Sequence, residues 1–149
     1  MPNPKARAAA LNASPEDAET QFYEALRDGD LARVMAVWAD DDDVVCVHPG
    51  GARVMGPQAV RAAFEAVFAS GTIAVHPEHV KRVQAMGCAV HSVLERIDVV
   101  TVDGPRTGWI VATNVYVKTS QGWRMVAHHA SPGAPDDIPE IADAPSVLH

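Results

Sequence analysis

The sequence has no cluster of positive charge. Its 149 residues include 12 lysines and arginines against 19 aspartates and glutamates, which gives a formal net charge of -7. Binding to nucleic acid or to an anionic membrane surface needs clustered basic side chains that release counterions, so the sequence excludes both partner classes. Small molecules or other proteins are the partners that this charge balance favours.

Cysteines and long apolar runs are also scarce. Cys46 and Cys88 are the two cysteines, and each lies in an apolar run and not at the paired spacing of a metal or redox motif. We therefore expect two buried thiols in a reducing compartment, the cytoplasm. No apolar stretch is long enough for a signal peptide or a membrane span, so a soluble protein is expected.

Several signature motifs of enzymes are missing. The chain has no glycine-rich phosphate loop and no Gly-x-Ser-x-Gly nucleophile elbow. The four aspartates from Asp40 to Asp43 lack the glycine and the distal glutamate of a calcium loop. His76 and His79 flank Pro77 without a third zinc ligand. The sequence therefore predicts neither a metal nor a cofactor.

The first half of the chain has the pattern of helices. Ser14 is a capping residue for a helix that begins at Pro15, has acidic residues in its first turn and ends at Gly29. A second helix is expected over 30–39 and a third over 56–71, each with apolar residues at helical spacing.

The period of the apolar residues then changes to that of strands. A short strand, Val44 to Val47, leads into the turn His48-Pro49-Gly50-Gly51, which fixes the direction of a titratable side chain. Turn residues separate four longer strand candidates, which form a meander: Thr72 to Ala85, Cys88 to Val102, Thr107 to Lys118 and Trp123 to Ser131.

Three N-terminal helices followed by a bent antiparallel meander predict an α+β fold. The sheet must curl to cover the helices, so we expect a cone-shaped sheet with the third helix across its concave face. A cavity at the mouth of such a cone is the usual place for a ligand. We predict one domain over residues 14–131, between a flexible leader, 1–13, and a proline-rich tail, 132–149.

Several short motifs follow one another along the chain. They are Phe22-Tyr23 leading to Gly29-Asp30-Leu31, then Trp38-Ala39-Asp40-Asp41, Gly56, and Trp123 leading to His128-His129-Ala130-Ser131. Their order resembles the nuclear transport factor 2-like superfamily. The resemblance runs from about Pro15 to Ser131 and implies a cystatin-like roll with a mixed edge. Ketosteroid isomerases, polyketide cyclases of the SnoaL type and the calcium/calmodulin-dependent kinase association domain are members, so the fold hosts several functions.

The resemblance also implies catalytic residues. Ketosteroid isomerases place an aspartate base before a proline at the end of the strand after the second helix, and this chain has His48 before Pro49 there. Their two oxyanion donors are a tyrosine on the first helix and a protonated aspartic acid on the penultimate strand. These two positions fall on Phe22 and Asn114. Tyr23 is about 100° around the helix from the tyrosine position and is not expected to replace it.

His48 and Asn114 each have a structural alternative. The His48 ring could cap its own turn by bonding to a nearby carbonyl, and this alternative stays open beside a pocket role. Asn114 lies in an apolar run, where an unpaired buried amide costs about 1 to 3 kcal/mol. A place in the cavity, where it finds partners, is therefore favoured for Asn114.

The register of the strands bears on Glu95. If Asp103-Gly104 is a two-residue turn, Glu95 lies next to Ala112 and on the face of Asn114 and Tyr116. Glu95 could instead pair with a neighbouring arginine at the surface.

Only one of the adjacent residues His128 and His129 can face the cavity, because successive side chains of a strand point to opposite faces. A bulge at Gly122 would put His128 beside Asn114. The family pattern instead favours the face of Trp123 and His129, and we follow it in predicting His129.

These arguments predict a small-molecule-binding domain. It would be an isomerase, cyclase or dehydratase that uses general acid-base catalysis, with His48 as the base and Asn114 as an oxyanion donor. For Trp38, a place in the core or at an interface is favoured over ligand stacking. The predicted ligand-binding residues are Phe22, Trp38, Glu95, Tyr116 and His129.

The alternative is a non-catalytic binding or oligomerisation module similar to the kinase association domain. Both alternating sets of residues in 107–118 are largely apolar, and only one set can face the helices. We therefore also predict a homodimer through the outer face of the sheet.

Overall fold

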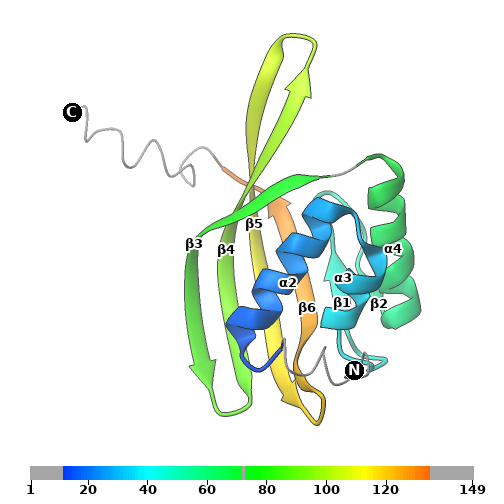
Figure 1. Cartoon of the computed structure of the whole chain (residues 1–149), viewed down its shortest axis with the longest axis vertical. Coiled ribbons are helices and arrows are strands. Elements are labelled where there is room, and N and C mark those ends of the chain that lie inside the picture. The colour runs from blue at the N-terminus through cyan, green and yellow to red at the C-terminus, as the bar shows by residue number, and fades with distance from the viewer. Residues whose placement is uncertain (1–11, 72, 135–149) are drawn as a thin grey trace, which may run out of the picture.

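The computed structural model describes residues 12–71 and 73–134 (Figure 1). In this part of the chain the helices are α2 (Pro15–Asp28), α3 (Leu31–Val37) and α4 (Pro57–Ala69). The strands are β1 (Val45–Val47), β2 (Val54–Met55), β3 (Ala74–Ala85), β4 (Cys88–Thr101), β5 (Gly104–Thr119) and β6 (Gly122–Pro132). The predicted α+β class is confirmed.

The helix boundaries follow from capping. The Ser14 hydroxyl accepts a hydrogen bond from the Asp17 amide at 3.1 Å, which satisfies one of the free amides at the start of α2. Gly29 ends α2 in the left-handed conformation, with φ 63°, which favours glycine. The Asp30 carboxylate then caps α3 by accepting from the Arg33 amide at 3.1 Å. The predicted junction of two helices at Gly29 and Asp30 is thus confirmed.

The sheet has the strand order β2-β1-β6-β5-β4-β3. Neighbouring strands are antiparallel, except for the pair of β1 and β6. These two strands are parallel, and Cys46 lies opposite His128. This gives the mixed edge expected from the resemblance. The two residues of β2 are too few to show a period, so the sequence did not predict that strand.

The β4–β5 turn differs from its predicted position. Thr101 pairs with Gly104, so the register of the two strands differs by two residues from the prediction and Glu95 lies opposite Ile110, not next to Ala112. A shift of two residues keeps every side chain on its face. Glu95 therefore still shares the inner face with Asn114, as predicted.

The helix that covers the concave face of the sheet is α2, so the prediction that the third helix, α4, does so is wrong. Figure 1 shows α2 in front of the sheet, where it contacts β3, β5 and β6, whereas α4 packs against α3 and β2. The reason lies in the apolar faces. Eight residues of α2 are buried, among them Phe22 and Tyr23, but only Val60 and Phe64 of α4 are.

Two backbone hydrogen bonds involve residues just outside the predicted domain, 14–131. Asn12 is fully buried and its carbonyl accepts from the Trp123 amide at 2.8 Å, while the Gly133 amide donates to the Trp109 carbonyl at 2.9 Å. The remainder of the predicted leader and tail, 1–11 and 135–149, lies outside the described residues. Within the described residues, no helix is both long and apolar enough to cross a membrane.

Candidate functional site

A cavity of about 270 Å³ lies between the helices and the inner face of the sheet. Its polar side chains are those of His48, Glu95 and His128, and no lysine or arginine is among the described residues that line it. The remaining lining residues are Leu26, Pro49, Phe64, Val67, Ile73, Val75, Ile97, Ile110 and Ala130. A mostly apolar hollow with a few converging polar groups is typical of a small-molecule site.

A buried chain of hydrogen bonds connects two of these polar groups. The Tyr23 hydroxyl donates to Glu95 Oε2 at 2.7 Å, and Asn114 Nδ2 donates to the Tyr23 oxygen at 2.9 Å. At the other end, His128 Nδ1 lies 2.6 Å from Asn114 Oδ1. An amide oxygen only accepts, so His128 Nδ1 carries a proton, and every donor points from His128 towards Glu95. Glu95 Oε1 and His128 Nε2 remain for a ligand.

Burial shifts the pKa values of Glu95 and His128, the two ends of this hydrogen-bonded chain, in opposite directions. It raises the pKa of Glu95 to about 7, although the bond from Tyr23 opposes the shift. It lowers the pKa of His128 to about 3, and the nearby His48 and His129 act in the same direction. Near neutral pH, Glu95 therefore exchanges a proton while His128 stays neutral.

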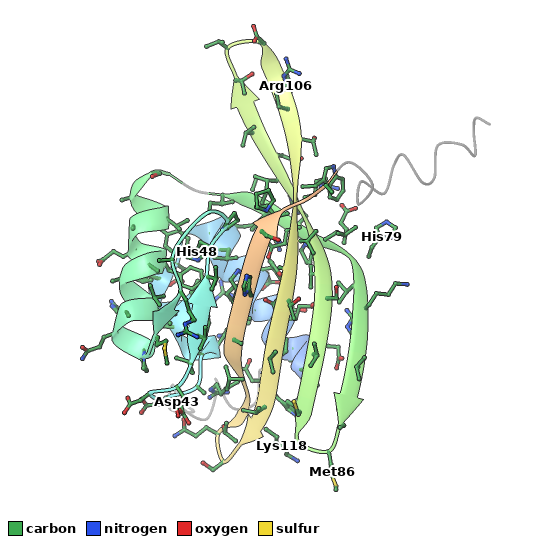
Figure 2. The ribbon with its side chains drawn as sticks, turned by 180° about the vertical axis from the view of Figure 1, so that it is seen from behind. Asp43, His48, His79, Met86, Arg106 and Lys118 are labelled. Atoms are coloured by element: carbon green, nitrogen blue, oxygen red, sulfur yellow. The ribbon has the colours of Figure 1, made fainter. Side chains whose placement is uncertain are left out.

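His48 follows β1 and lies on the cavity wall between α4 and β6 (Figure 2). Its carbonyl accepts from the Gly51 amide at 2.8 Å, which closes the predicted turn. The ring packs edge-on against Phe64, with centroids 4.8 Å apart, and lies 6.0 Å from the ring of His128. Burial lowers the pKa of His48, so its imidazole is a weaker base than an exposed one. Its role as the catalytic base stays a prediction.

The structure places Asn114 behind the cavity wall. It is fully buried and does not line the cavity, and its amide bonds to Tyr23 and His128. Asn114 therefore orients two other side chains, which differs from the predicted role of direct donor to a ligand. The sequence argument that a buried amide needs partners nevertheless holds.

The prediction that His129 faces the cavity is wrong. His129 is exposed, whereas His128 is 4% exposed and lines the cavity. A register shift between Val115 and Tyr116 inserts an extra residue on β6, so that Asn114 pairs with His128. Such a bulge reverses the alternation of side chains beyond it.

Tyr23 does not line the cavity, but it has a part in the buried hydrogen bonds that the sequence does not predict. Phe22 and Tyr23 are both buried, with ring centroids 5.0 Å apart, and the longer Tyr23 side chain reaches Glu95 on the sheet. Phe22 does not line the cavity, but its ring packs 5.2 Å from that of His128. Tyr23 is therefore buried although it lies about 100° around α2 from Phe22.

Tyr116 and Trp38 lie away from this cavity. Tyr116 is fully buried and its ring centroid is 5.0 Å from that of His91, which belongs to a second polar cluster. There His91 Nδ1 lies 3.1 Å from Glu19 Oε2, and Arg82 donates to the other Glu19 oxygen at 3.1 Å. Burial alone would raise the pKa of Glu19, but these two partners lower it. None of these residues lines the cavity.

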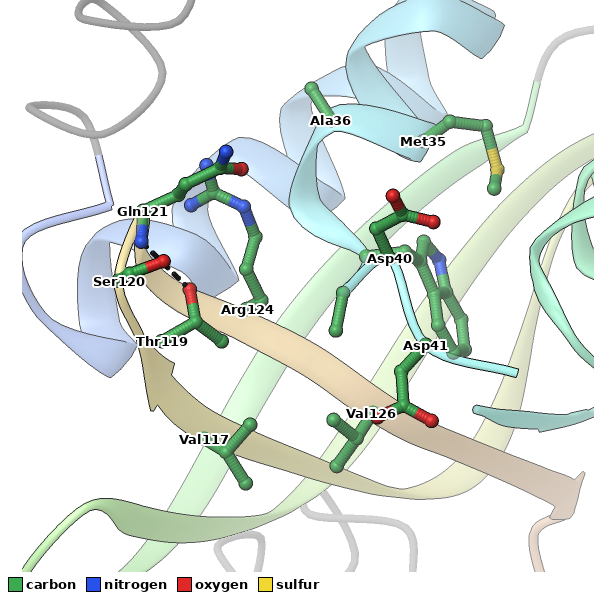
Figure 3. Close-up of a pocket in the computed structure, with 12 residues that line it drawn as sticks. Met35, Ala36, Asp40, Asp41, Val117, Thr119, Ser120, Gln121, Arg124 and Val126 are labelled. Atoms are coloured by element: carbon green, nitrogen blue, oxygen red, sulfur yellow. Dashed lines mark hydrogen bonds between the residues drawn. The ribbon is translucent and has the colours of Figure 1, made fainter. Parts of the chain in front are cut away.

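Trp38 lines a different and larger hollow, of about 580 Å³, between α3 and the β5–β6 turn (Figure 3). Arg124 and Gln121 lie on one side of it, and Asp40 and Asp41 on the other. Both aspartates are exposed. We favour the smaller cavity as the functional site, because it gathers buried acid and base groups with strongly shifted pKa values, which is typical of active sites.

A curled sheet closed by helices over a cavity with titratable side chains defines the nuclear transport factor 2-like class of proteins. Within this class, the chain belongs to the SnoaL-like domain family, whose sequence model matches residues 16–135. No match to a curated protein was found.

Solved structures are similar over most of their length. A proposed calcium/calmodulin-dependent protein kinase type II association domain from Thiobacillus denitrificans has 38% identity and a TM-score of 0.76, over 83% of this chain and 98% of that one. A proposed dehydratase of the nuclear transport factor 2-like family from Streptomyces avermitilis has 30% identity and a TM-score of 0.70, over 78% and 91%. The CaMKII hub of S. rosetta, at 22% identity and a TM-score of 0.63 over 89% and 100%, shares the fold.

Proposed function

We propose that the protein is an acid-base enzyme that dehydrates or isomerises a small neutral molecule in the cone cavity. The observation that carries this proposal is the buried Glu95 carboxyl, whose pKa of about 7 suits proton exchange at neutral pH. The similarity to a proposed dehydratase at 30% identity supports it.

Glu95 takes the part of base in this reaction. Its carboxylate removes a proton from the carbon next to a carbonyl group and then returns that proton to the leaving hydroxyl, so that water departs and a carbon–carbon double bond forms. Returning the proton to another carbon gives an isomerisation. His128 Nε2 accepts a hydrogen bond from the substrate hydroxyl, because Nδ1 of the same ring donates to Asn114. His48 stays the alternative base.

The lining residues also define the substrate. An anionic substrate would be buried without a positive partner, since no lysine or arginine is among the described lining residues. An ionised Glu95 adds repulsion. A neutral hydroxy ketone with an apolar body fits the lining best.

The test is proton exchange in deuterium oxide. Small neutral ketones and their β-hydroxy analogues are incubated with the protein and followed by NMR. We expect deuterium at the carbon next to the carbonyl, or loss of water, with wild type and at least a hundredfold less with Glu95→Gln. Glu65→Gln, on the exposed face of α4, is the control. Equal rates for Glu95→Gln and wild type would contradict the proposal.

A second candidate function is a non-catalytic assembly module. The similarity to a proposed kinase association domain at 38% identity supports it, as do apolar side chains on the outer face of the sheet, among them Leu94, Val111 and Val115, which are half-buried in the monomer. This candidate predicts a homodimer through that face. Sedimentation at micromolar concentration should give a dimer that Val111→Asp dissociates, and a wild-type monomer would overturn it.

We also propose a cytoplasmic location. Cys46 and Cys88 are both free thiols, as expected in a reducing compartment. Fractionation of the native host would test this, and recovery of the protein outside the cytoplasm would contradict it.

A further inference from the structure

Arg124 is the one buried arginine among the described residues, with 7% of its surface exposed. The ion pairs of the described arginines are those of Arg33, Arg82 and Arg96, so Arg124 has no carboxylate partner in this part of the chain. Its Nη1 donates to the neighbouring Trp123 carbonyl at 3.1 Å. A guanidinium has five N–H donors, so most of them remain for another group.

Arg124 lines the hollow of about 580 Å³ between α3 and the β5–β6 turn, which we call the Arg124 hollow (Figure 3). Burial disfavours a charge that has no partner, and it lowers the pKa of Arg124 for this reason. An anionic group held in the hollow against the guanidinium would offset that cost, because hydrogen bonds between two charged groups are the strong ones.

Polar side chains of the β5–β6 turn lie on the same side of the hollow as Arg124 (Figure 3). Thr119 Oγ1 donates to the Gly122 carbonyl at 2.7 Å and accepts from the Gln121 amide at 3.1 Å, so this hydroxyl holds the turn together. The side chains of Ser120 and Gln121 are exposed and make no hydrogen bond to another described residue. They are therefore available as neutral donors beside a bound anion.

The opposite side of the hollow carries negative charge. Asp40 and Asp41 lie there (Figure 3). Asp41 Oδ1 accepts from the Asp43 amide at 2.8 Å, whereas the Asp40 carboxylate has no hydrogen bond or ion pair within the described part of the chain. Both carboxylates can thus bind a cation. The rest of the lining is apolar and consists of Met35, Ala36, Trp38, Ala39, Val117 and Val126.

The charges on the two sides define the ligand. A simple anion would pair with Arg124 but would meet two carboxylates and one guanidinium, which sum to a net negative charge. A simple cation would leave Arg124 buried without a partner. A molecule with an anionic group and a cationic group, joined by an apolar segment, complements both sides and the apolar lining between them.

We propose that the Arg124 hollow binds a small zwitterion, with its carboxylate at Arg124 and its ammonium group at Asp40 and Asp41. Its volume of about 580 Å³ lies within the usual range for small-molecule sites, of roughly 300 to 1,000 Å³. The hollow shares no lining residue with the cone cavity, so it is a second site and does not depend on the proposed function.

The test compares three sets of probes: ω-amino acids from ω-aminopentanoate to ω-aminooctanoate, and the alkanoates and alkylamines of the same lengths. Binding is followed by the indole N–H resonance of Trp38, which lines the hollow. The best ω-amino acid should bind at least about tenfold more tightly than its alkylamine, through the pair with buried Arg124. It should exceed its alkanoate by about three- to fivefold, because the aspartates are exposed.

Removing the positive charge gives the sharpest variant. Arg124→Gln should weaken binding of that ω-amino acid at least about tenfold, to the affinity of the alkylamine. Arg106→Gln is the matched control, because Arg106 is exposed on the β4–β5 hairpin, away from the hollow (Figure 2). Equal binding by these two variants would overturn the inference, as would a Trp38 resonance that no zwitterion moves.

A second pair of variants covers the case in which Arg124→Gln does not fold. The double variant Asp40→Asn and Asp41→Asn should lower the affinity of the ω-amino acid to that of the alkanoate. The double variant Asp42→Asn and Asp43→Asn removes the same charge from exposed neighbours that do not line the hollow, and it should bind as wild type does. Equal affinities in the two double variants would contradict the proposed ammonium site.

Glu95→Gln separates this site from the cone cavity. The variant should bind the ω-amino acid as wild type does, since Glu95 lines only the other cavity. Loss of binding in Glu95→Gln would place the zwitterion in the cone cavity and reject the second site. If no probe binds and Arg124→Gln converts a dimer into a monomer in sedimentation, the partner of Arg124 is a second copy of the chain, and the inference is wrong.

Discussion

Glu95 and His128 stand at opposite ends of one buried hydrogen-bonded chain, and burial shifts the pKa of the carboxyl up and that of the imidazole down. Their ordinary values are 4.5 and 6.5. Between these two pH values, an unfolded chain holds a proton on His128 and none on Glu95, whereas the folded protein has the reverse. Folding therefore moves a proton from the histidine to the glutamate without changing the number bound.

We predict that Glu95→Gln stabilises the protein at high pH. The folded pKa of about 7 lies above the ordinary 4.5, so the favourable contribution of protonated Glu95 is fully present below 4.5 and is lost as the pH rises through 7. The free energy of unfolding of the variant should exceed that of wild type by up to about 3 kcal/mol at pH 8, and by little at pH 4. Urea unfolding at both values measures this. A difference independent of pH would contradict it, and Glu65→Gln should show no effect.

We predict the opposite dependence for His128→Asn, which keeps a donor near the Asn114 oxygen. The folded pKa of His128 lies below the ordinary 6.5, so the contribution of the neutral ring is present above 6.5 and is lost as the pH falls towards 3. Relative to wild type, the variant should gain stability by up to about 1.4 kcal/mol for each pH unit below 6.5. Unfolding curves from pH 7 to 4 check the slope. His129→Asn, at the exposed neighbour, is the control, and equal slopes would contradict the prediction.

We predict that Tyr23→Phe raises the pKa of Glu95 above 7, because the tyrosine hydroxyl donates to the carboxylate and opposes the effect of burial. It should also cost about 1 to 3 kcal/mol of stability, since Asn114 Nδ2 loses its acceptor. Carboxyl NMR and urea unfolding measure the two effects. Phe22→Leu should reduce stability through packing and leave the pKa of Glu95 unchanged, so a shift in that variant as large as in Tyr23→Phe would argue against the hydrogen bond.

The chain ends should be dispensable. Residues 1–11 and 135–149 have a proline, alanine and acid content without a periodic apolar face. Removing both should barely change the melting temperature. Removal that extends through Asn12 should lower it, because the Trp123 amide loses its acceptor. A fall of many degrees on removing 1–11 and 135–149 alone would show that one of them docks on the domain.

The sequence predicts the correct face of the sheet for a side chain when the error in strand register is an even number of residues. The predicted residue opposite Glu95 is Ala112 and the observed one is Ile110. This shift of two residues keeps Glu95 on the inner face. The prediction that His129 faces the cavity is wrong because β6 has one extra residue opposite Val115 and Tyr116, which reverses the alternation of its side chains. No glycine or proline marks that bulge in the sequence. The hydrogen bond between Tyr23 and Glu95 could not be predicted, because a helical wheel places a Cβ atom and does not tell how far a long side chain reaches.

The position of the cavity could be predicted in outline only. The turn after β1 placed His48 on its wall, since proline and glycine fix local geometry. The chain of hydrogen bonds joins residues up to 91 positions apart, and no local pattern encodes such contacts. The pKa shifts follow from burial, which depends on the whole fold.

The most direct test of this account is the titration of the Glu95 carboxyl carbon by NMR, with and without a neutral alcohol such as butanol. The account predicts a midpoint near pH 7 in the free protein and a change in that midpoint when the alcohol binds, because Glu95 faces the cavity. A midpoint near 4.5 that the alcohol leaves unchanged would contradict the claim that Glu95 is the acid-base group of the site.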